Sequence, residues 1–591
     1  MWPLSNSYPE KALEGVAGQE YDYIIVGGGT AGCAVASRLS EDPKVTVLVI
    51  ERGSVHDTFL SRVPLTSCTF DAVPGNVLRK SEPNENCHGR RIDLVHSESL
   101  GGSSRINGML YTRGLPAMYD EWLSVTGYQD WTWDNVKPYF EKVEDMRRPH
   151  MGAASTRGQV QITQHPPLFE MNRYLQKSAS ALGLPVEHEL NREDAPAAGY
   201  FYLDCTIDSG GERHSAFRSY LPRQLAIERQ NHLVICTSVM AARLELDTAG
   251  SRVLGVHVRA TNRDGTALIR ARREVIITSG AIRSPQLLQL SGIGPAPLLQ
   301  KHNIALKRDL PVGKHLNDHY GIPISMEVPF DQTFHFMEKS PLQALWQLAR
   351  FLAFRQGWMR SPSTQSAVFF KTSTFDTTSS TMPLQRSQLD ASKPENLPDA
   401  EVMIIPANVV PGSHKGKSMA TLFTCLLRPK SEGCVEIAST DPEVDPTISL
   451  NVLSEPADIQ VAKRALRFSL RLAHDFINKS GFSHSAKMLV SPRPSSQGAE
   501  GPEYDDEELA EFTKANIRAI LHHSSSCRMA REEDGGVVDE QLRVHGFSNL
   551  RIADASVFPV IPVTHTMAPT YMVAERCADF VKKAWQGKEG V

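Results

Sequence analysis

Two groups of residues in this chain have types and spacing that could do chemistry. In the first, Gly27, Gly29 and Gly32 follow a short apolar run in the order GxGxxG. The first glycine permits a tight turn, the second lets backbone approach a pyrophosphate, and the third lets a helix pack closely on a strand. Glu51 stands about 20 residues on, where a carboxylate accepts ribose hydroxyls. The pattern predicts a bound dinucleotide.

The second group is near the other end of the chain, where His522 and His523 lie in AILHHSSSCRM and His565 lies in VTHTMAP. Histidine is well suited to accept a proton near neutral pH, because its unperturbed pKa is about 6.5. Two converging imidazoles could act as a base and an orienting donor, whereas each taken singly is as readily a structural polar residue. No metal site is predicted, since neither CxxC nor the i, i+4 spacing of a zinc site is present.

The elements that must position these residues follow from the apolar pattern. Residues 23–26 and 45–50 predict two strands, and residues 31–39 predict an amphipathic helix between them. Phosphate would then meet the free N–H groups and the positive end of that helix. A buried strand at 274–278 leads into a helix from about Ser284, which predicts a second backbone approach to the cofactor.

The remaining pattern is mixed. Helices are predicted at 114–144, 169–182, 456–476 and 507–521, antiparallel strands at 231–247, 253–260, 401–405 and 421–427, and long loops at 55–92 and 374–397. Residues 335–360 are strongly apolar with spaced arginines, which is typical of an interfacial membrane helix or of the cover of a substrate cavity. The nearly neutral overall charge favours the cavity.

Length and composition limit the class of protein. A chain of 591 residues is too long to fold around a single hydrophobic core, so two or three domains are expected. The net charge of −4 disfavours nucleic acid or an anionic membrane surface as the main partner. Nine cysteines without paired spacing favour a reducing compartment. Without a signal peptide, a peroxisomal ending or a long apolar run, we expect a cytoplasmic protein with no membrane span. The oligomeric state is left open.

Four blocks together resemble the glucose–methanol–choline (GMC) family of flavin oxidoreductases over nearly the whole chain. They are the fingerprint at 27–51, LGGSSRINGMLYTRG at 100–114, GAIRSPQLLQLSGIGP at 280–295, and HHSSSCRM with DASVFP through His565. The resemblance implies an α/β fold, α+β overall, with a Rossmann-type FAD-binding domain and a discontinuous substrate domain on an antiparallel sheet. The expected parts are a tail at 1–20, the FAD-binding domain at 21–150, 216–325 and 536–591, and the substrate domain at 151–215 and 326–535.

The resemblance also implies roles for single residues. His522 would be the catalytic base and His565 the second catalytic histidine, although His523 replaces the family's usual proline, which leaves open whether it reaches the pocket instead. Cys425 is expected to be a buried structural thiol. The residues expected to hold FAD are Gly27, Gly29, Thr30, Ala31, Gly32, Glu51, Arg52, Ser103, Asn107, Gly108, Met109, Leu110, Val239, Asp554, Ala555, Thr566 and Met567.

Some family members link the flavin covalently through a histidine just before the position of Asn107. Here that residue is Ile106, which cannot form the bond, so non-covalent FAD is expected.

The activity that the resemblance implies is oxidation of a small-molecule alcohol to a carbonyl. Hydride would pass to flavin N5 and the proton to His522, with oxygen or another electron acceptor completing the cycle. Cyanohydrin cleavage without net redox and light-driven decarboxylation of fatty acids occur on the same fold and remain alternatives. The expected specificity segments, 55–92, 335–360 and 401–427, indicate a substrate larger and less polar than a simple sugar. Such a reaction would suit a step in a biosynthetic pathway.

Overall fold

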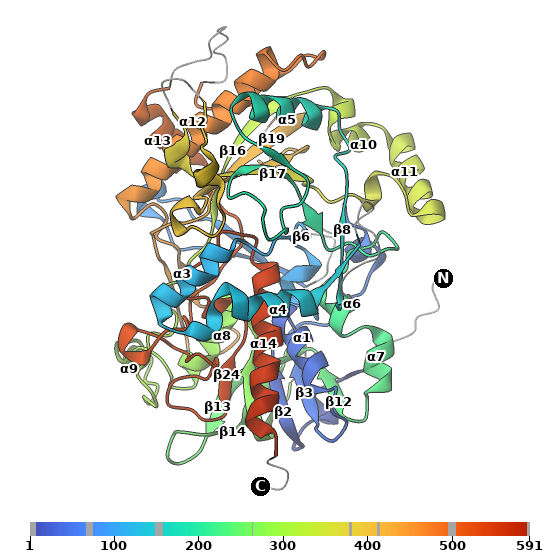
Figure 1. The fold of residues 1–591 in the computed structure, drawn as a ribbon. Coiled ribbons are helices and arrows are strands. Elements are labelled where there is room, and N and C mark those ends of the chain that lie inside the picture. Colours follow the sequence, from blue (N-terminus) through green and yellow to red (C-terminus); the bar gives the residue numbers. More distant parts are fainter. Residues whose placement is uncertain are drawn as a thin grey trace.

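The computed structural model describes residues 8–66, 75–147, 158–262, 264–376, 381–410, 414–493 and 504–587. Two large sheets with helices packed against them make up the fold, one in the lower half of Figure 1 and one in the upper half. This arrangement confirms the predicted α/β architecture with a second, mainly antiparallel sheet. No helix within these ranges combines the length and the apolar character needed to cross a bilayer.

The first sheet is built around parallel strands that are buried on both faces. Its order is β1 (Glu10–Lys11), β12 (Leu233–Cys236), β3 (Val47–Ile50), β2 (Glu20–Val26), β15 (Thr266–Ile277), β14 (Val253–Ala260) and β13 (Val239–Leu246), with β24 (Leu550–Ile552) also on β15. The continuous apolar runs of β2 and β3 follow from this double burial. The helices α1 (Thr30–Leu39) and α14 (Met567–Trp585) pack against each other beside this sheet.

The second sheet comes mainly from the middle of the chain. Its order is β22 (Lys487–Val490), β16 (Tyr320–Glu327), β19 (Met419–Leu426), β18 (Ala400–Ile405), β17 (Ser366–Phe370), β10 (Gly199–Tyr202) and β9 (Val186–Glu187), with β23 (Arg518–Ala519) also on β16. The long helix α12 (Pro456–Asn478) packs on β19, and α5 (Met171–Ala181) and α13 (Asp506–Asn516) pack on α12. The strand β16 crosses the expected domain boundary between 325 and 326.

Several sequence predictions are corrected here. Residues 231–247 are not one antiparallel strand, because β12 pairs in parallel with β3 and ends at Cys236. Ser238, whose φ is 56°, then turns the chain before β13. The expected loop at 55–92 contains α2 (Phe59–Arg62) and the strand β4 (Asn76–Lys80), which pairs with β5 (Asp93–Ser97), while residues 67–74 lie outside the described ranges.

Helix boundaries differ at two further places. The helix expected from about 284 is α8 (Gly280–Leu290), and the one expected at 507–521 ends at Asn516, because the chain then joins β16 as β23. Predicted helices at 114–144 are present as α3 (Pro116–Thr126) and α4 (Trp133–Val143). The other elements are α6 (Ala216–Tyr220), α7 (Arg223–Glu228), α9 (Ala296–Lys301), α10 (His335–Lys339), α11 (Pro341–Phe354), β6 (Leu110–Tyr111), β7 (Glu144–Met146), β8 (Val160–Gln164), β11 (Asp204–Cys205), β20 (Cys434–Glu436) and β21 (Thr447–Ser449).

A buried ion pair ties the last strand to the first sheet. Arg551 in β24 places Nε 2.7 Å from Glu274 Oε2 in β15, and both side chains are almost fully buried. The indole N–H of Trp585, at the end of α14, donates to the other Glu274 oxygen at 2.8 Å. Because the pair is out of water, removing one partner leaves a buried charge without its counter-ion.

The change Arg551→Ala should therefore lower the free energy of unfolding by roughly 3–5 kcal/mol. The double change Glu274→Gln with Arg551→Met should recover much of that loss, because no charge is left buried. Urea unfolding followed by circular dichroism measures both. As a control, Arg272→Ala removes a part-exposed partner of Asp22 and should cost less than about 1 kcal/mol. Equal losses for the two single changes would contradict the stabilising role of the buried pair.

Candidate active site

A cavity of about 780 Å³ lies where the two sheets meet and is lined by residues of both. Its volume is within the range of about 300–1,000 Å³ that is usual for ligand pockets. All but two of the predicted site residues line it. These are His522, His565, Gly27, Gly29, Thr30, Ala31, Glu51, Arg52, Ser103, Asn107, Gly108, Leu110, Val239, Asp554, Ala555, Thr566 and Met567.

The two exceptions, Gly32 and Met109, lie behind the lining. A Cβ at Gly32 would be 1.9 Å from the Gly27 carbonyl oxygen, so this glycine allows α1 to sit against the turn after β2. Met109 is fully buried, and its carbonyl accepts the N–H of Thr206 at 2.8 Å. Both residues therefore support the cavity wall without forming its surface.

Part of the cavity wall is a cradle of bare backbone. A Cβ added at Gly29 would have no protein atom closer than 3.8 Å, and one at Gly280 would have none within 4 Å. Gly102 lies so close to Gly29 that a Cβ on Gly102 would be 2.8 Å from the Gly29 Cα. The N-terminus of α1, beginning at Thr30, opens onto this space. Free backbone N–H groups at a helix start fit a pyrophosphate.

Two buried carboxylates hold the cradle together. Glu51 accepts the N–H groups of Gly28 and Gly53, each at 2.8 Å, and burial raises its pKa. Asp554, just after β24, accepts the Gly280 N–H at 2.8 Å and the Ser284 hydroxyl at 2.6 Å. Each carboxylate thus fixes a glycine turn while also lining the cavity.

Four side chains form a linked row, and two of them, His522 and His565, line the cavity. The rings of His522 and His565 face each other edge to face, with centroids 5.1 Å apart. His522 Nδ1 lies 2.9 Å from the Nδ1 of His319, and His565 Nε2 lies 3.1 Å from Glu401 Oε1. His319 directly precedes β16, and Glu401 lies in β18, so the second sheet orients both predicted catalytic histidines.

Burial keeps the imidazoles of His522 and His319 neutral. It lowers the pKa of His522 well below its usual value, an effect increased by the neighbouring His319 and His565. Burial also lowers the pKa of His319 to about 3. A neutral imidazole has one ring nitrogen with a free lone pair, so it can accept a proton at neutral pH.

A second pair supports the His522 backbone. Asp318 Oδ1 accepts the His522 N–H at 2.6 Å, and Asp318 Oδ2 lies 3.4 Å from His523 Nε2. Burial raises the pKa of Asp318 to about 8 and lowers that of His523 to about 4, so near neutral pH the carboxyl holds the proton. The flanking Leu521 and Ser525 have φ of 70° and 67°. This unusual backbone lets both adjacent histidines line the cavity.

Sequence reasoning missed Asp318, His319 and Glu401. The sequence carries only a weak signal for them, because each is simply a titratable residue at the start of an apolar run. Their position beside the histidines depends on strand pairing, which a single sequence does not show. Cys425 is buried and does not line the cavity, as expected of a structural thiol. The expectation that residues 335–360 cover the cavity is wrong, because none of them lines it.

Comparisons with known proteins agree with this geometry. The family model for GMC oxidoreductase matches residues 21–321, and a second model of that family matches residues 429–574. Dehydrogenase pkfF from Emericella nidulans is 30% identical over 98% of this chain and 98% of its own length. Oxygen-dependent choline dehydrogenase from Pseudomonas fluorescens is 30% identical over 95% and 94%. Formate oxidase from Aspergillus oryzae, a solved structure, covers 96% of this chain and 99% of its own with a TM-score of 0.84 and 26% identity.

The lowered pKa values of buried histidines such as His319 predict that acid lowers the free energy of unfolding. The folded-state pKa of His319, about 3, is below the unfolded value of about 6.5, so its contribution to stability is complete above that value and is lost as pH falls toward 3. At about pH 5 this loss is roughly 2 kcal/mol. Asp318 acts in the opposite direction, because its raised pKa favours folding as pH falls below about 8.

The change His319→Asn should therefore reduce the drop in unfolding free energy between about pH 7.5 and about pH 5 by roughly 2 kcal/mol. Urea unfolding at the two pH values measures it. His88→Asn, at an exposed histidine, is the matched control and should show the full drop of the unaltered protein. A full drop in the His319→Asn variant as well would contradict the assignment.

Proposed function

The chain belongs to the GMC oxidoreductase family, and from this premise we propose that it oxidises an alcohol to a carbonyl compound with non-covalently bound FAD. The observation that carries the proposal is one cavity that is lined both by the glycine cradle and by His522 and His565, whose rings face each other. Choline dehydrogenase is a relative with an alcohol substrate in its name, which supports the reaction class.

The residues present fit the cofactor. Gly27, Gly29 and Gly280 would surround the pyrophosphate, and Glu51 would lie at the ribose. Bound FAD would supply the hydride acceptor at flavin N5. Ile106 lines the cavity where a histidine would be needed for a covalent link.

The hydroxyl proton of the substrate would be transferred to the histidines. A neutral His522 that donates its Nδ1–H to His319 leaves the Nε2 lone pair free for the hydroxyl proton of the substrate. The Glu401 carboxylate lies beside His565 and would balance the positive charge that develops at the pair of histidines when the proton is accepted, while His565 holds the substrate oxygen. His319 and Glu401 thus act as positioning residues for the two catalytic histidines.

The cavity lining contributed by β18 and β19 supports a substrate less polar than a simple sugar. Glu401, Met403 and Ile405 alternate along β18 and so share one face, and Phe423 of β19 pairs opposite Met403. Met403, Ile405 and Phe423 all line the cavity. An apolar alcohol of this kind would suit a modification step in a biosynthetic pathway.

The change His522→Ala should slow flavin reduction by about 10²–10⁴-fold, because the proton acceptor is lost. The test mixes yellow protein anaerobically with a panel of aliphatic and aromatic alcohols and follows flavin bleaching; air or an artificial acceptor then distinguishes oxidase from dehydrogenase. The absorption spectrum of bound FAD should not change, and His88→Ala, at an exposed site, should reduce normally. Unchanged reduction in the His522 variant would refute its role, and turnover with the flavin staying oxidised would indicate a lyase.

Non-covalent binding has its own test. Acid precipitation of the yellow protein should leave FAD in the supernatant and a colourless pellet, because Ile106 has no atom that bonds to the flavin. Flavin fluorescence in each fraction measures the distribution. Fluorescence that stays with the denatured polypeptide would overturn this part of the proposal.

A further inference from the structure

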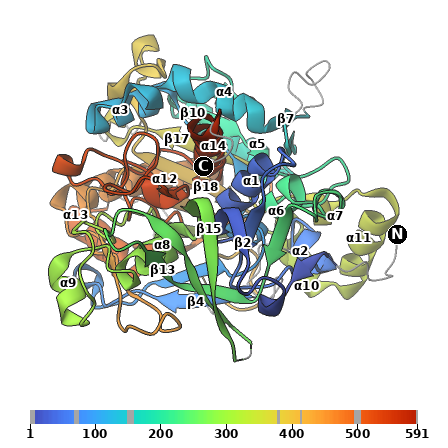
Figure 2. The ribbon, with the colours of Figure 1, turned by 90° about the horizontal axis from the view of Figure 1, so that it is seen from below.

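The apolar surface of this protein is concentrated at one place. Of the twelve large apolar side chains that the described residues expose, five lie on α11 and two, Phe59 and Leu60, on α2. Figures 1 and 2 show α11 at the margin of the molecule, with α2 and α10 near it in Figure 2. Those on α11 are 51% to 80% exposed: Leu342, Leu345, Trp346, Leu352 and Phe354. We call these seven side chains the α2/α11 patch.

The patch is held firmly in place. The opposite side of α11 buries Gln347 and Phe351, and the Phe351 ring contacts that of Phe59 edge to face at 6.3 Å. Gln347 also accepts the N–H of Trp358 at 3.1 Å. The exposed face is therefore not a frayed end of the fold.

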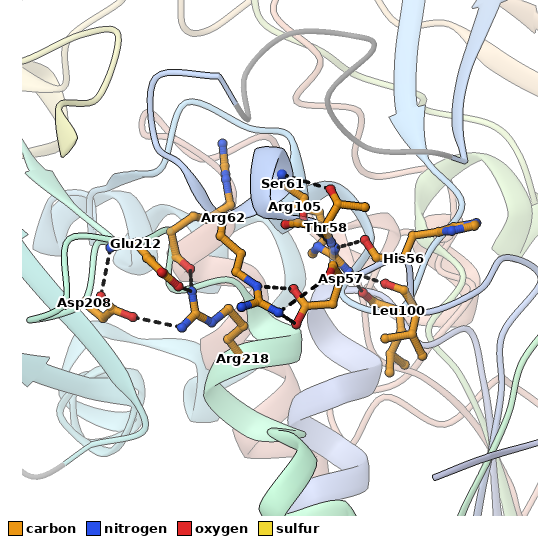
Figure 3. A network of polar contacts seen from close by, with 12 residues as sticks. His56, Asp57, Thr58, Ser61, Arg62, Leu100, Arg105, Asp208, Glu212 and Arg218 are labelled. Atoms are coloured by element: carbon orange, nitrogen blue, oxygen red, sulfur yellow. Dashed lines mark hydrogen bonds and ion pairs between the residues drawn. The ribbon is translucent and has the colours of Figure 1, made fainter. Parts of the chain in front are cut away.

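Polar contacts also anchor α2 (Figure 3). Asp57 pairs with Arg62 at 2.6 Å, and Arg105, which is buried, donates to the His56 carbonyl at 2.8 Å and to Ser61 Oγ at 3.1 Å. Thr58 caps the helix by accepting the Ser61 N–H. These bonds keep the short helix in place with Phe59 and Leu60 exposed.

The charge along residues 339–360, which include α11, is one-sided. Residues 339–360 include Lys339, Arg350, Arg355 and Arg360 but no aspartate or glutamate. Arg355 is paired with Glu212 at 3.2 Å, and within the described ranges no carboxylate pairs with the other three. The chain as a whole has a net charge of −4, so this segment departs locally from the overall balance.

We propose that the α2/α11 patch docks the protein on an anionic lipid surface. Tryptophan, leucine and phenylalanine on one face with basic residues beside them are typical of helices that lie in a membrane interface. Anionic headgroups would attract the basic residues while the apolar side chains enter the acyl boundary. A second copy fits less well, because a two-fold contact sets each patch against itself and brings like charges together.

The test is sedimentation of the FAD-loaded protein with vesicles. We expect binding to phosphatidylcholine vesicles that contain roughly one quarter phosphatidylserine, weaker binding without it, and weakening in high salt. The double change Leu345→Glu with Leu352→Glu should reduce binding at least about tenfold, and Arg350→Glu should reduce it on anionic vesicles only. Flavin absorbance verifies the fold of each variant.

A matched control separates the patch from general hydrophobicity. Leu306, which follows α9, is 50% exposed outside the patch, and Leu306→Glu should bind as the unaltered protein does. The proposal would be overturned if the unaltered protein did not bind the vesicles, or if the Leu345→Glu with Leu352→Glu variant bound them as well as the unaltered protein does. A concentration-dependent dimer that Leu345→Glu with Leu352→Glu abolishes, without vesicle binding, would instead assign the patch to a second copy.

Discussion

Parallel pairing to β15 is the constraint on which the rest of the structure depends. Ile277, at the end of that strand, lies opposite both Val26 of β2 and Ile552 of β24. Parallel strands in register end at the same edge of a sheet, so the residues that follow them must meet there. Gly27, Gly280 and Asp554 are those residues, and the hydrogen bond from the Gly280 N–H to Asp554 joins two of the three. Segments more than 500 residues apart thereby form one wall.

The two sheets contribute different kinds of group to the same cavity. The first presents backbone N–H groups at glycine turns, which suit phosphate. The second contributes Glu401 and, just before β16, His319, which orient His565 and His522. Keeping His522 and His319 buried and neutral costs stability in acid.

Sequence predicts well where the signal is local. The turn between β2 and α1 needs a backbone geometry that glycine permits, so the spacing of its glycines can be recognised in the sequence. Glu401 and His319 could not be assigned to the site, because each acts through a neighbour on another strand or loop. A local sequence pattern does not reveal which strands pair with each other. The same reason explains β12, whose parallel partner β3 lies far back in the chain. For residues 335–360, the apolar composition allowed a membrane-interface helix or the cover of a cavity, and it could not indicate which face of α11 would be buried.

The order of the pieces along the chain has a consequence for biosynthesis. A growing polypeptide leaves the ribosome from its N-terminus, so the turn at Gly27 emerges early, while β24, His565 and α14 emerge almost last. Until then β15 has an unpaired edge and α1 has no α14 to cover it. The cavity wall is therefore completed late, and a premature stop codon upstream of β24 would yield a nascent chain that has the glycine turn but lacks the part of the wall formed by Asp554 and His565.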